Sequence, residues 1–364
     1  MSSSHVLVAY PPIIHLMAVT LPIFESRPMR PDYAQGPRSL AAVKLLRLSI
    51  TDRCNLRCQY CMPEGGVHFH EKADLLSTSE IISVAAAARA VGVTHFKVTG
   101  GEPTVRADVV EIVRGLAALR PVDLSMTTNG MLLERLAEDL KQAGLDRITV
   151  SLDSLQADRF AQITGASTTL GPQALPTLWR GINAAIAAGF KKLKLNVVVM
   201  GGINDDEVAD FARLTIDRPW TVRFIEYMPL GDSRLVDDAE RYTVDNALVR
   251  QRITAEVGPL VPALRTDEPG VGPGEVYQLE GARGRLGFIS AMSRPFCETC
   301  NRLRLTAMGQ LRSCLFDGGE VDVLAALRPV LIPSRIIDLM RQCVAMKPEV
   351  HSSRGNRAMS QLGG

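Results

Sequence analysis

From residue 45 onward, short apolar segments alternate with helical segments, and this alternation restricts the fold more than any other feature of the sequence. Such a chain forms a parallel sheet with helices packed against it. The predicted strands are 45–49, 95–99, 123–127, 147–151, 194–200 and 222–227, and the predicted helices are 79–91, 108–119, 132–143, 175–188 and 205–214. The expected fold is therefore α/β, an incomplete (β/α)6 TIM-type barrel.

Most of the predicted strands end in polar residues or glycines. The sequences at these ends are GGEP at 100–103, TTNG at 127–130, SLD at 151–153 and EYM at 226–228. In (β/α) barrels, the functional residues lie at the carboxyl ends of the strands. We therefore expect the functional site at this edge of the sheet.

The chain divides into three predicted parts. Residues 1–38 are expected to be an N-terminal extension that is disordered or non-catalytic, 39–229 the barrel, and 230–364 a C-terminal region that covers the barrel mouth. Residues 6–24 are apolar, but prolines interrupt them and no basic residue precedes them, unlike a signal peptide. The net charge of +2 favours neither a nucleic acid nor a membrane as partner.

Six of the seven cysteines form two groups of three, which indicates metal ligation in a reducing compartment, the cytoplasm, rather than disulfides. The first group is Cys54, Cys58 and Cys61. Thiolates select iron–sulfur clusters, zinc or copper(I). On a four-iron cluster, three cysteines leave one iron open for a cofactor or substrate. The alternative is zinc, with His68 or His70 as fourth ligand.

The second group is Cys297, Cys300 and Cys314. A zinc site completed by Cys343 or His351 is again the alternative to a cluster, and Cys343 is otherwise expected to be a buried apolar side chain. Four arginines lie at 294–312 with Glu298 as the only acid. Alternation along a strand places Arg302 and Arg304 on one face, and guanidinium groups suit phosphate.

The segment TDRCNLRCQYCMP at 51–63 resembles the cluster motif of radical S-adenosylmethionine enzymes, and in particular that of the GTP 3′,8-cyclase (MoaA) family. The GGEP segment, the spacing of the second cysteine group and the terminal Gly363-Gly364 also resemble this family, whose tail reaches into the active site. The resemblance covers residues 45–364. Residues 36–38 match poorly the segment that precedes the first strand in the family.

The resemblance implies two [4Fe-4S] clusters, one on each cysteine group, and S-adenosylmethionine as cofactor. It implies no catalytic side chain beyond these cofactors. The implied contacts to S-adenosylmethionine are Tyr60, Gly101, Ser151 and Met228. The implied contacts to GTP are Arg47, Lys97, Thr127, Lys194, Arg302, Leu303 and Arg304. Lys97 takes a position associated with arginine, and Leu303 offers only backbone or apolar contact.

The implied activity is conversion of GTP to (8S)-3′,8-cyclo-7,8-dihydroguanosine 5′-triphosphate with S-adenosylmethionine and a reductant. This is the first step of molybdenum cofactor (molybdopterin) biosynthesis. The implied partners are an electron donor and cyclic pyranopterin monophosphate synthase as the downstream enzyme, and a homodimer is one state open to the chain. Two alternatives are a radical S-adenosylmethionine enzyme that modifies a peptide with an auxiliary cluster, and a non-catalytic zinc-binding module.

Overall fold

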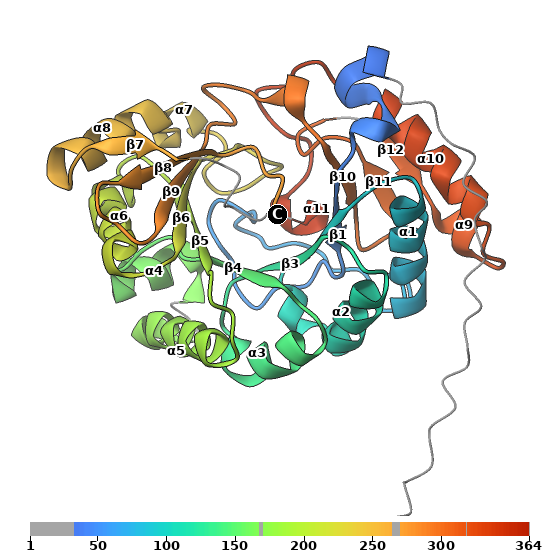
Figure 1. Ribbon diagram of the computed structural model, residues 1–364, viewed down its shortest axis with the longest axis horizontal. Helices are drawn as coiled ribbons and strands as arrows, with labels where there is room; N and C mark the ends of the chain where they lie inside the picture. Colours follow the sequence, from blue (N-terminus) through green and yellow to red (C-terminus); the bar gives the residue numbers. More distant parts are fainter. Residues whose placement is uncertain (1–32, 167–169, 264–269, 318, 364) are drawn as a thin grey trace, which may run out of the picture. The chain divides into compact units, whose positions relative to one another are not determined.

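A computed structural model describes residues 33–166, 170–263, 270–317 and 319–363, and Pro31–Gly364 form one compact unit. The strands are β1 Leu45–Ser49, β2 His95–Thr99, β3 Asp123–Thr128, β4 Arg147–Ser151, β5 Lys194–Val199, β6 Thr221–Glu226, β7 Leu260–Pro262, β8 Glu275–Leu279, β9 Arg285–Ile289, β10 Arg302–Leu305, β11 Gln310–Arg312 and β12 Glu320–Asp322. They form one sheet in the order β12-β11-β10-β1-β2-β3-β4-β5-β6-β9-β8-β7, which curves around a central space (Figure 1). The sheet begins and ends on different strands, so the barrel is open, and the predicted fold class is confirmed.

The helices α1 to α6 lie on the outer side of this sheet (Figure 1). The α-helices are α1 Thr78–Ala90, α2 Val109–Ala118, α3 Leu133–Gln142, α4 Ala157–Thr164, α5 Ala174–Ala187, α6 Val208–Asp217, α7 Ala239–Tyr242, α8 Asn246–Glu256, α9 Leu324–Leu327, α10 Pro333–Ala345 and α11 Met359–Leu362. The 3-10 helices are η1 Tyr33–Arg38, η2 Leu40–Ala42, η3 Pro103–Val105, η5 Gly171–Gln173, η6 Asp205–Glu207 and η8 Cys297–Thr299. Helix α1 begins at a capping box, in which the Ser77 hydroxyl accepts from the Glu80 N–H and the Glu80 carboxylate accepts from the Ser77 N–H.

Within the barrel, one helix was not predicted and another was shifted, and the helices α7 to α11 of the C-terminal region were not predicted. No helix was predicted between β4 and the helix at 175–188, where the structure has α4, which is capped by Gly165 with a φ of 67°. This helix has only eight residues, too few for a clear 3.6-residue repeat. The helix predicted at 205–214 starts as η6 and continues as α6 to Asp217.

The C-terminal region extends the sheet at both of its edges. Strand β9 pairs in parallel with β6, and β10 pairs in parallel with β1, so that Leu45 lies opposite Arg302 and Arg47 opposite Arg304. Eight consecutive strands of the described chain, from β10 to β9, are therefore parallel. Strands β11, β12, β8 and β7 continue the sheet in antiparallel pairs.

The two faces of the parallel strands differ sharply in chemistry. Leu46, Leu48, Phe96 and Val98 are completely buried in the apolar core between sheet and helices. The intervening positions, such as Arg47 and the other polar residues described below, face the inside of the barrel. Parallel sheets covered on both faces are usually apolar on both. The polar inner face therefore indicates a space for a polar ligand.

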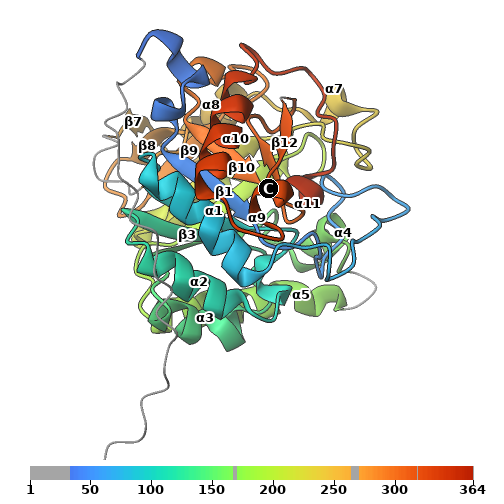
Figure 2. The same ribbon diagram turned by 90° about the vertical axis from the view of Figure 1, so that its right-hand side faces the viewer.

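The N-terminal helices η1 and η2 pack against α10, which itself lies beside α1 (Figure 2). The Arg38 Nε atom donates a hydrogen bond to the Lys347 carbonyl at 3.0 Å. Residues 33–38, which belong to the predicted extension, are thus folded onto the C-terminal region. The apolar segment 6–24 lies outside the described residues, and none of the described helices has the length and apolarity needed to cross a membrane.

Candidate active site

Both cysteine groups line a single cavity of about 330 Å³ inside the barrel. Cys54, Cys58 and Cys61 follow the carboxyl end of β1, while Cys297 and Cys300 precede the amino end of β10, the strand paired with β1. Cys314 follows β11 and completes the second group. All seven cysteines have free thiols. The structure thus brings the two predicted groups to one cavity, from opposite ends of two neighbouring parallel strands.

The loop that carries the first cysteine group is held at both ends by backbone hydrogen bonds. Gly101 N donates to Thr51 O at 2.7 Å, and Arg57 N donates to Thr164 O, at the end of α4, at 2.9 Å. A Cβ atom on residue 101 would lie only 2.4 Å from Arg53 O. Glycine at 101 is therefore required by the close approach of this loop.

Glu102 ties the ends of β2 and β3 together. Its carboxylate accepts hydrogen bonds from Thr104 Oγ1 at 2.5 Å, Asn129 N at 2.6 Å, Thr128 Oγ1 at 2.7 Å and Thr104 N at 3.0 Å. Burial raises the pKa of Glu102, and the four donors oppose this shift by stabilising the charged form. With its oxygens occupied in this way, Glu102 supports the shape of the cavity rather than proton transfer.

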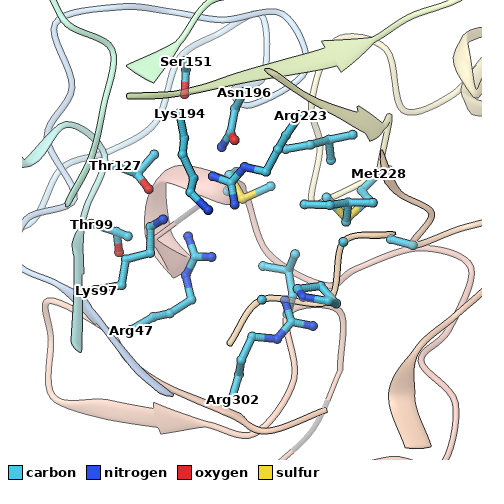
Figure 3. Close-up of a pocket in the computed structure, with 18 of the residues that line it drawn as sticks. Arg47, Lys97, Thr99, Thr127, Ser151, Lys194, Asn196, Arg223, Met228 and Arg302 are labelled. Carbon is cyan, nitrogen blue, oxygen red and sulfur yellow. The ribbon is translucent and has the colours of Figure 1, made fainter. Parts of the chain in front are cut away.

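The four residues predicted to contact S-adenosylmethionine, Tyr60, Gly101, Ser151 and Met228, all line the cavity. Ser151 and Met228 are seen in Figure 3. The Tyr60 hydroxyl donates to Asp153 Oδ2 at 2.8 Å, and Val198 N donates to Asp153 Oδ1 at 2.9 Å. Burial raises the pKa of Asp153 to about 6 and that of the Tyr60 hydroxyl well above its usual value. Asp153 was not predicted as a site residue, although its segment was identified at the end of β4.

Six of the seven residues predicted to contact GTP also line the cavity, namely Arg47, Lys97, Thr127, Lys194, Arg302 and Arg304. Leu303 does not, because its side chain is completely buried in the core between sheet and helices. The structure therefore does not place Leu303 at the cavity. The predicted alternation of Arg302 and Arg304 on one face of a strand is confirmed.

The basic side chains of the cavity point toward one another (Figure 3). Arg47 lies opposite Lys97 on β2 and opposite Arg304 on β10, and Lys194 and Arg223 approach from β5 and β6. Arg223 was not predicted. Its side chain has room because residue 287 on the adjacent strand is glycine, whose added Cβ would lie 2.9 Å from Arg223 Cγ.

These basic groups repel one another. Burial lowers the pKa of Arg47 well below its usual value, and the charges of Arg304, Arg302 and Arg223 lower it further. Burial likewise lowers the pKa of Lys97, with Arg223 and Arg47 as the strongest neighbouring charges. The pKa of Arg304 falls to about 9 through burial and the charge of Arg302. A bound polyanion would relieve this repulsion, so the cluster fits a ligand such as a triphosphate.

Two uncharged groups support the same conclusion. The Thr127 hydroxyl and the Asn196 side-chain oxygen are buried against the cavity and have no hydrogen-bond partner among the described residues. Buried polar atoms are usually satisfied, so these two are suited to contact a polar ligand. The sequence carried one signal for the missed residues: Asn196 and Arg223 stand at alternate positions of their strands, as Arg47 and Lys97 do.

The C-terminal tail enters this cavity. Gly363 O accepts a hydrogen bond from Arg304 Nη1 at 2.7 Å, and a Cβ on residue 363 would lie 2.6 Å from Thr99 Oγ1. Helix α11 correspondingly lies inside the ring of strands (Figure 1). Gly364 lies outside the described residues. The expectation that the tail reaches the active site therefore holds for Gly363.

The side chains considered as fourth zinc ligands are mostly engaged elsewhere. His70 Nδ1 lies 3.0 Å from Asp52 Oδ2, and the two ring nitrogens of His351 lie 2.8 and 2.7 Å from the carbonyl oxygens of Ala291 and Ser352. Cys343 is a buried thiol that donates to Gly319 O at 3.4 Å, as expected of a core side chain. Among the described residues, no three His, Cys, Asp or Glu side chains are arranged to hold one metal ion.

Comparison with known proteins places this cavity in a defined class. Residues 48–215 match the family model described as Radical SAM superfamily, and residues 220–353 match the one described as Molybdenum Cofactor Synthesis C. The fold resembles that of Streptococcus suis SuiB bound to S-adenosylmethionine, with a TM-score of 0.54 and 14% identity over 88% of this chain and 77% of that chain. The chain is thus a radical S-adenosylmethionine enzyme, a class that uses an iron–sulfur cluster and S-adenosylmethionine.

Closer relatives define the family. The GTP 3′,8-cyclase of Pelotomaculum thermopropionicum is 46% identical, over 88% of this chain and 98% of the relative. The GTP 3′,8-cyclase of Rippkaea orientalis is 44% identical, over 88% of this chain and 99% of the relative. The chain belongs to the GTP 3′,8-cyclase family. The zinc-binding and peptide-modifying alternatives are therefore set aside.

Proposed function

We propose that this chain converts GTP to (8S)-3′,8-cyclo-7,8-dihydroguanosine 5′-triphosphate, the first step of molybdenum cofactor biosynthesis. One observation carries the proposal. A single cavity is lined by two groups of three free thiols and, between them along the strands, by a cluster of basic side chains. A cluster-bound cofactor and a nucleotide triphosphate can therefore occupy the same cavity.

The number of clusters is part of this proposal. Cys54, Cys58 and Cys61 would hold one [4Fe-4S] cluster, and Cys297, Cys300 and Cys314 a second. Soft thiolates in groups of three fit clusters that keep one iron free of protein ligands. When bound, the first cluster and S-adenosylmethionine supply the radical that removes hydrogen from C3′ of GTP. Tyr60, Gly101, Ser151 and Met228 would hold S-adenosylmethionine.

The basic side chains would hold the triphosphate of GTP. Arg47, Lys97, Lys194, Arg302 and Arg304 carry the charge, and the Thr127 hydroxyl supplies a polar contact. Leu303, which does not line the cavity, would contribute only through the backbone that positions Arg302 and Arg304. Guanidinium forks give the phosphates a fixed orientation, which places the ribose between the two cysteine groups. The barrel wall surrounds the cavity and the tail is held beside Arg304, which would limit access of water to the reacting sugar.

The proposal extends to the surroundings of the enzyme. An electron donor would reduce the clusters in the cytoplasm, and the product would pass to cyclic pyranopterin monophosphate synthase. Within the chain, residues 39–229 would carry the first cluster and S-adenosylmethionine, and residues 230–364 the second cluster and the Gly-Gly tail. The free thiols suit a reducing compartment and thus support the proposal that the enzyme works in the cytoplasm.

The test separates the two cysteine groups. The first triple variant changes Cys54, Cys58 and Cys61 to Ala, and the second changes Cys297, Cys300 and Cys314 to Ala. Each should retain roughly half of the approximately eight irons expected for two four-iron clusters. The first variant should not cleave S-adenosylmethionine, whereas the second should cleave it without forming the cyclised nucleotide. The matched control is Cys343→Ala, which removes a thiol that does not line the cavity.

Iron and sulfide are measured on anaerobically reconstituted protein, and the products by chromatography and mass spectrometry. Cleavage of S-adenosylmethionine by the first variant would refute the first site. An unchanged iron content in the second variant would refute the second cluster. Zinc in place of iron in the parent protein would refute both.

A further inference from the structure

A buried lysine lies against the second cysteine group. Lys347 follows helix α10 and is only 3% exposed. Its Nζ atom donates hydrogen bonds to Cys300 O at 3.0 Å and Arg302 O at 3.2 Å. The Lys347 carbonyl accepts from Arg38 Nε at 3.0 Å, and its N–H donates to Val344 O at 3.1 Å. The backbone of Lys347 is thus fixed by η1 on one side and α10 on the other.

The charge on Lys347 has no carboxylate beside it. No ion pair joins Lys347 to an Asp or Glu of the described chain, and carbonyl oxygens are its hydrogen-bond partners. A buried ammonium group is costly unless an anion compensates it.

The second cysteine group lies next to this charge. The Lys347 Nζ atom is held on the backbone of Cys300 and Arg302, both of which line the cavity. Thiolates that ligate a cluster at this position would supply the missing negative charge.

We propose that Lys347 is a positioning residue for the second cluster, and that its fixed positive charge raises the reduction potential of that cluster. The inference rests on the proposed function, which places a cluster on Cys297, Cys300 and Cys314. One-electron reduction makes a cluster more negative, and cluster potentials depend on net charge and hydrogen bonds nearby. A cation held against the Cys300 segment stabilises the more negative state.

The experiment isolates the second cluster by using the full chain in which Cys54, Cys58 and Cys61 are Ala. In this background, Lys347→Met removes both charge and hydrogen bonds, whereas Lys347→Gln removes the charge but keeps an N–H donor. The control is Lys191→Gln, which neutralises an exposed lysine outside the cavity. Potentiometric titration with dithionite, followed by electron paramagnetic resonance, gives the midpoint potential. Iron is counted in every sample.

Both Lys347 variants should retain the iron of one cluster and shift its midpoint potential to more negative values, and the control should not shift. An unchanged potential in both variants would overturn the inference. A parent-like potential in Lys347→Gln alone would also overturn it, because hydrogen bonding rather than charge would then be responsible. Loss of iron from both variants would make Lys347 a requirement for assembly instead. Absence of iron from the background protein itself would refute the second cluster and, with it, this inference.

Discussion

Replacement of Lys97 by Met tests whether the crowded basic groups exist to bind a polyanion. Lys97 lies on β2 opposite Arg47, and its Nζ atom contacts Thr149 Oγ1 at 3.4 Å. In the free protein the variant loses a charge that burial, Arg223 and Arg47 all disfavour, so its thermal midpoint should rise. With GTP the variant lacks one charge-assisted contact of about 1.5–3 kcal/mol, so affinity should fall roughly tenfold to 150-fold.

The pH dependence gives a second measure of the same effect. The folded protein holds the pKa of Lys97 below its usual value, so below that usual value the unfolded chain binds more protons. The stability of the parent should therefore gain from this residue as pH rises through that window, and the Lys97→Met variant should lack this gain. A gain in stability with rising pH is the behaviour expected of a cationic group whose pKa is lower in the folded than in the unfolded protein.

The assay is equilibrium binding of GTP and thermal unfolding with and without GTP, on reconstituted protein of verified iron content. Lys191→Met, at an exposed position outside the cavity, is the control and should change neither quantity. A variant whose free form melts at lower temperature while its GTP affinity is unchanged would refute the reasoning. Lys97 would then be a structural side chain rather than a phosphate ligand.

Two further predictions concern other walls of the cavity. Arg304→Ala should weaken GTP binding by roughly tenfold to 150-fold, because one charge-assisted contact is lost. It should also free the tail at Gly363, which would be seen as faster proteolysis of the C-terminus. An unchanged affinity for GTP would show that Arg304 does not belong to the phosphate site. Gly101→Ala should destabilise the loop of the first cysteine group by about 1–3 kcal/mol, because the added Cβ would overlap Arg53 O. The variant should therefore also contain less iron. A normal iron content and a normal thermal midpoint would contradict the close approach of residue 101 to Arg53.

The alternation of apolar and helical segments was enough to predict the barrel, because each of the six predicted strands follows a helix or loop and carries its own apolar repeat. The structure has all six strands within one or two residues of the predicted bounds. The edge strands β9 and β10 could not be predicted in this way. Their place beside β6 and β1 depends on pairing between residues far apart in the chain, which local patterns do not report.

The candidate site shows the same limit. The cysteine groups were predictable because ligand spacing is a local property, and Arg302 and Arg304 because strand alternation is local. Lys347 was not, since nothing near it in the sequence marks it, and its importance comes from folding of α10 against the Cys300 segment. Arg223 lay at a strand position of the correct parity, but its role depends on the space left by Gly287 on β9.

The pairing of β10 with β1 explains why the two halves of the chain form one site. Arg47 on β1 belongs to the half that carries the first cysteine group, whereas Arg304, directly opposite on β10, belongs to the half that carries the second. Each half alone would carry only its own row of the basic residues. Because the backbone ladder fixes the register, the distance between the two cysteine groups is set by strand length rather than by a flexible linker. A substrate held by both rows is thereby held at a defined position between the two groups.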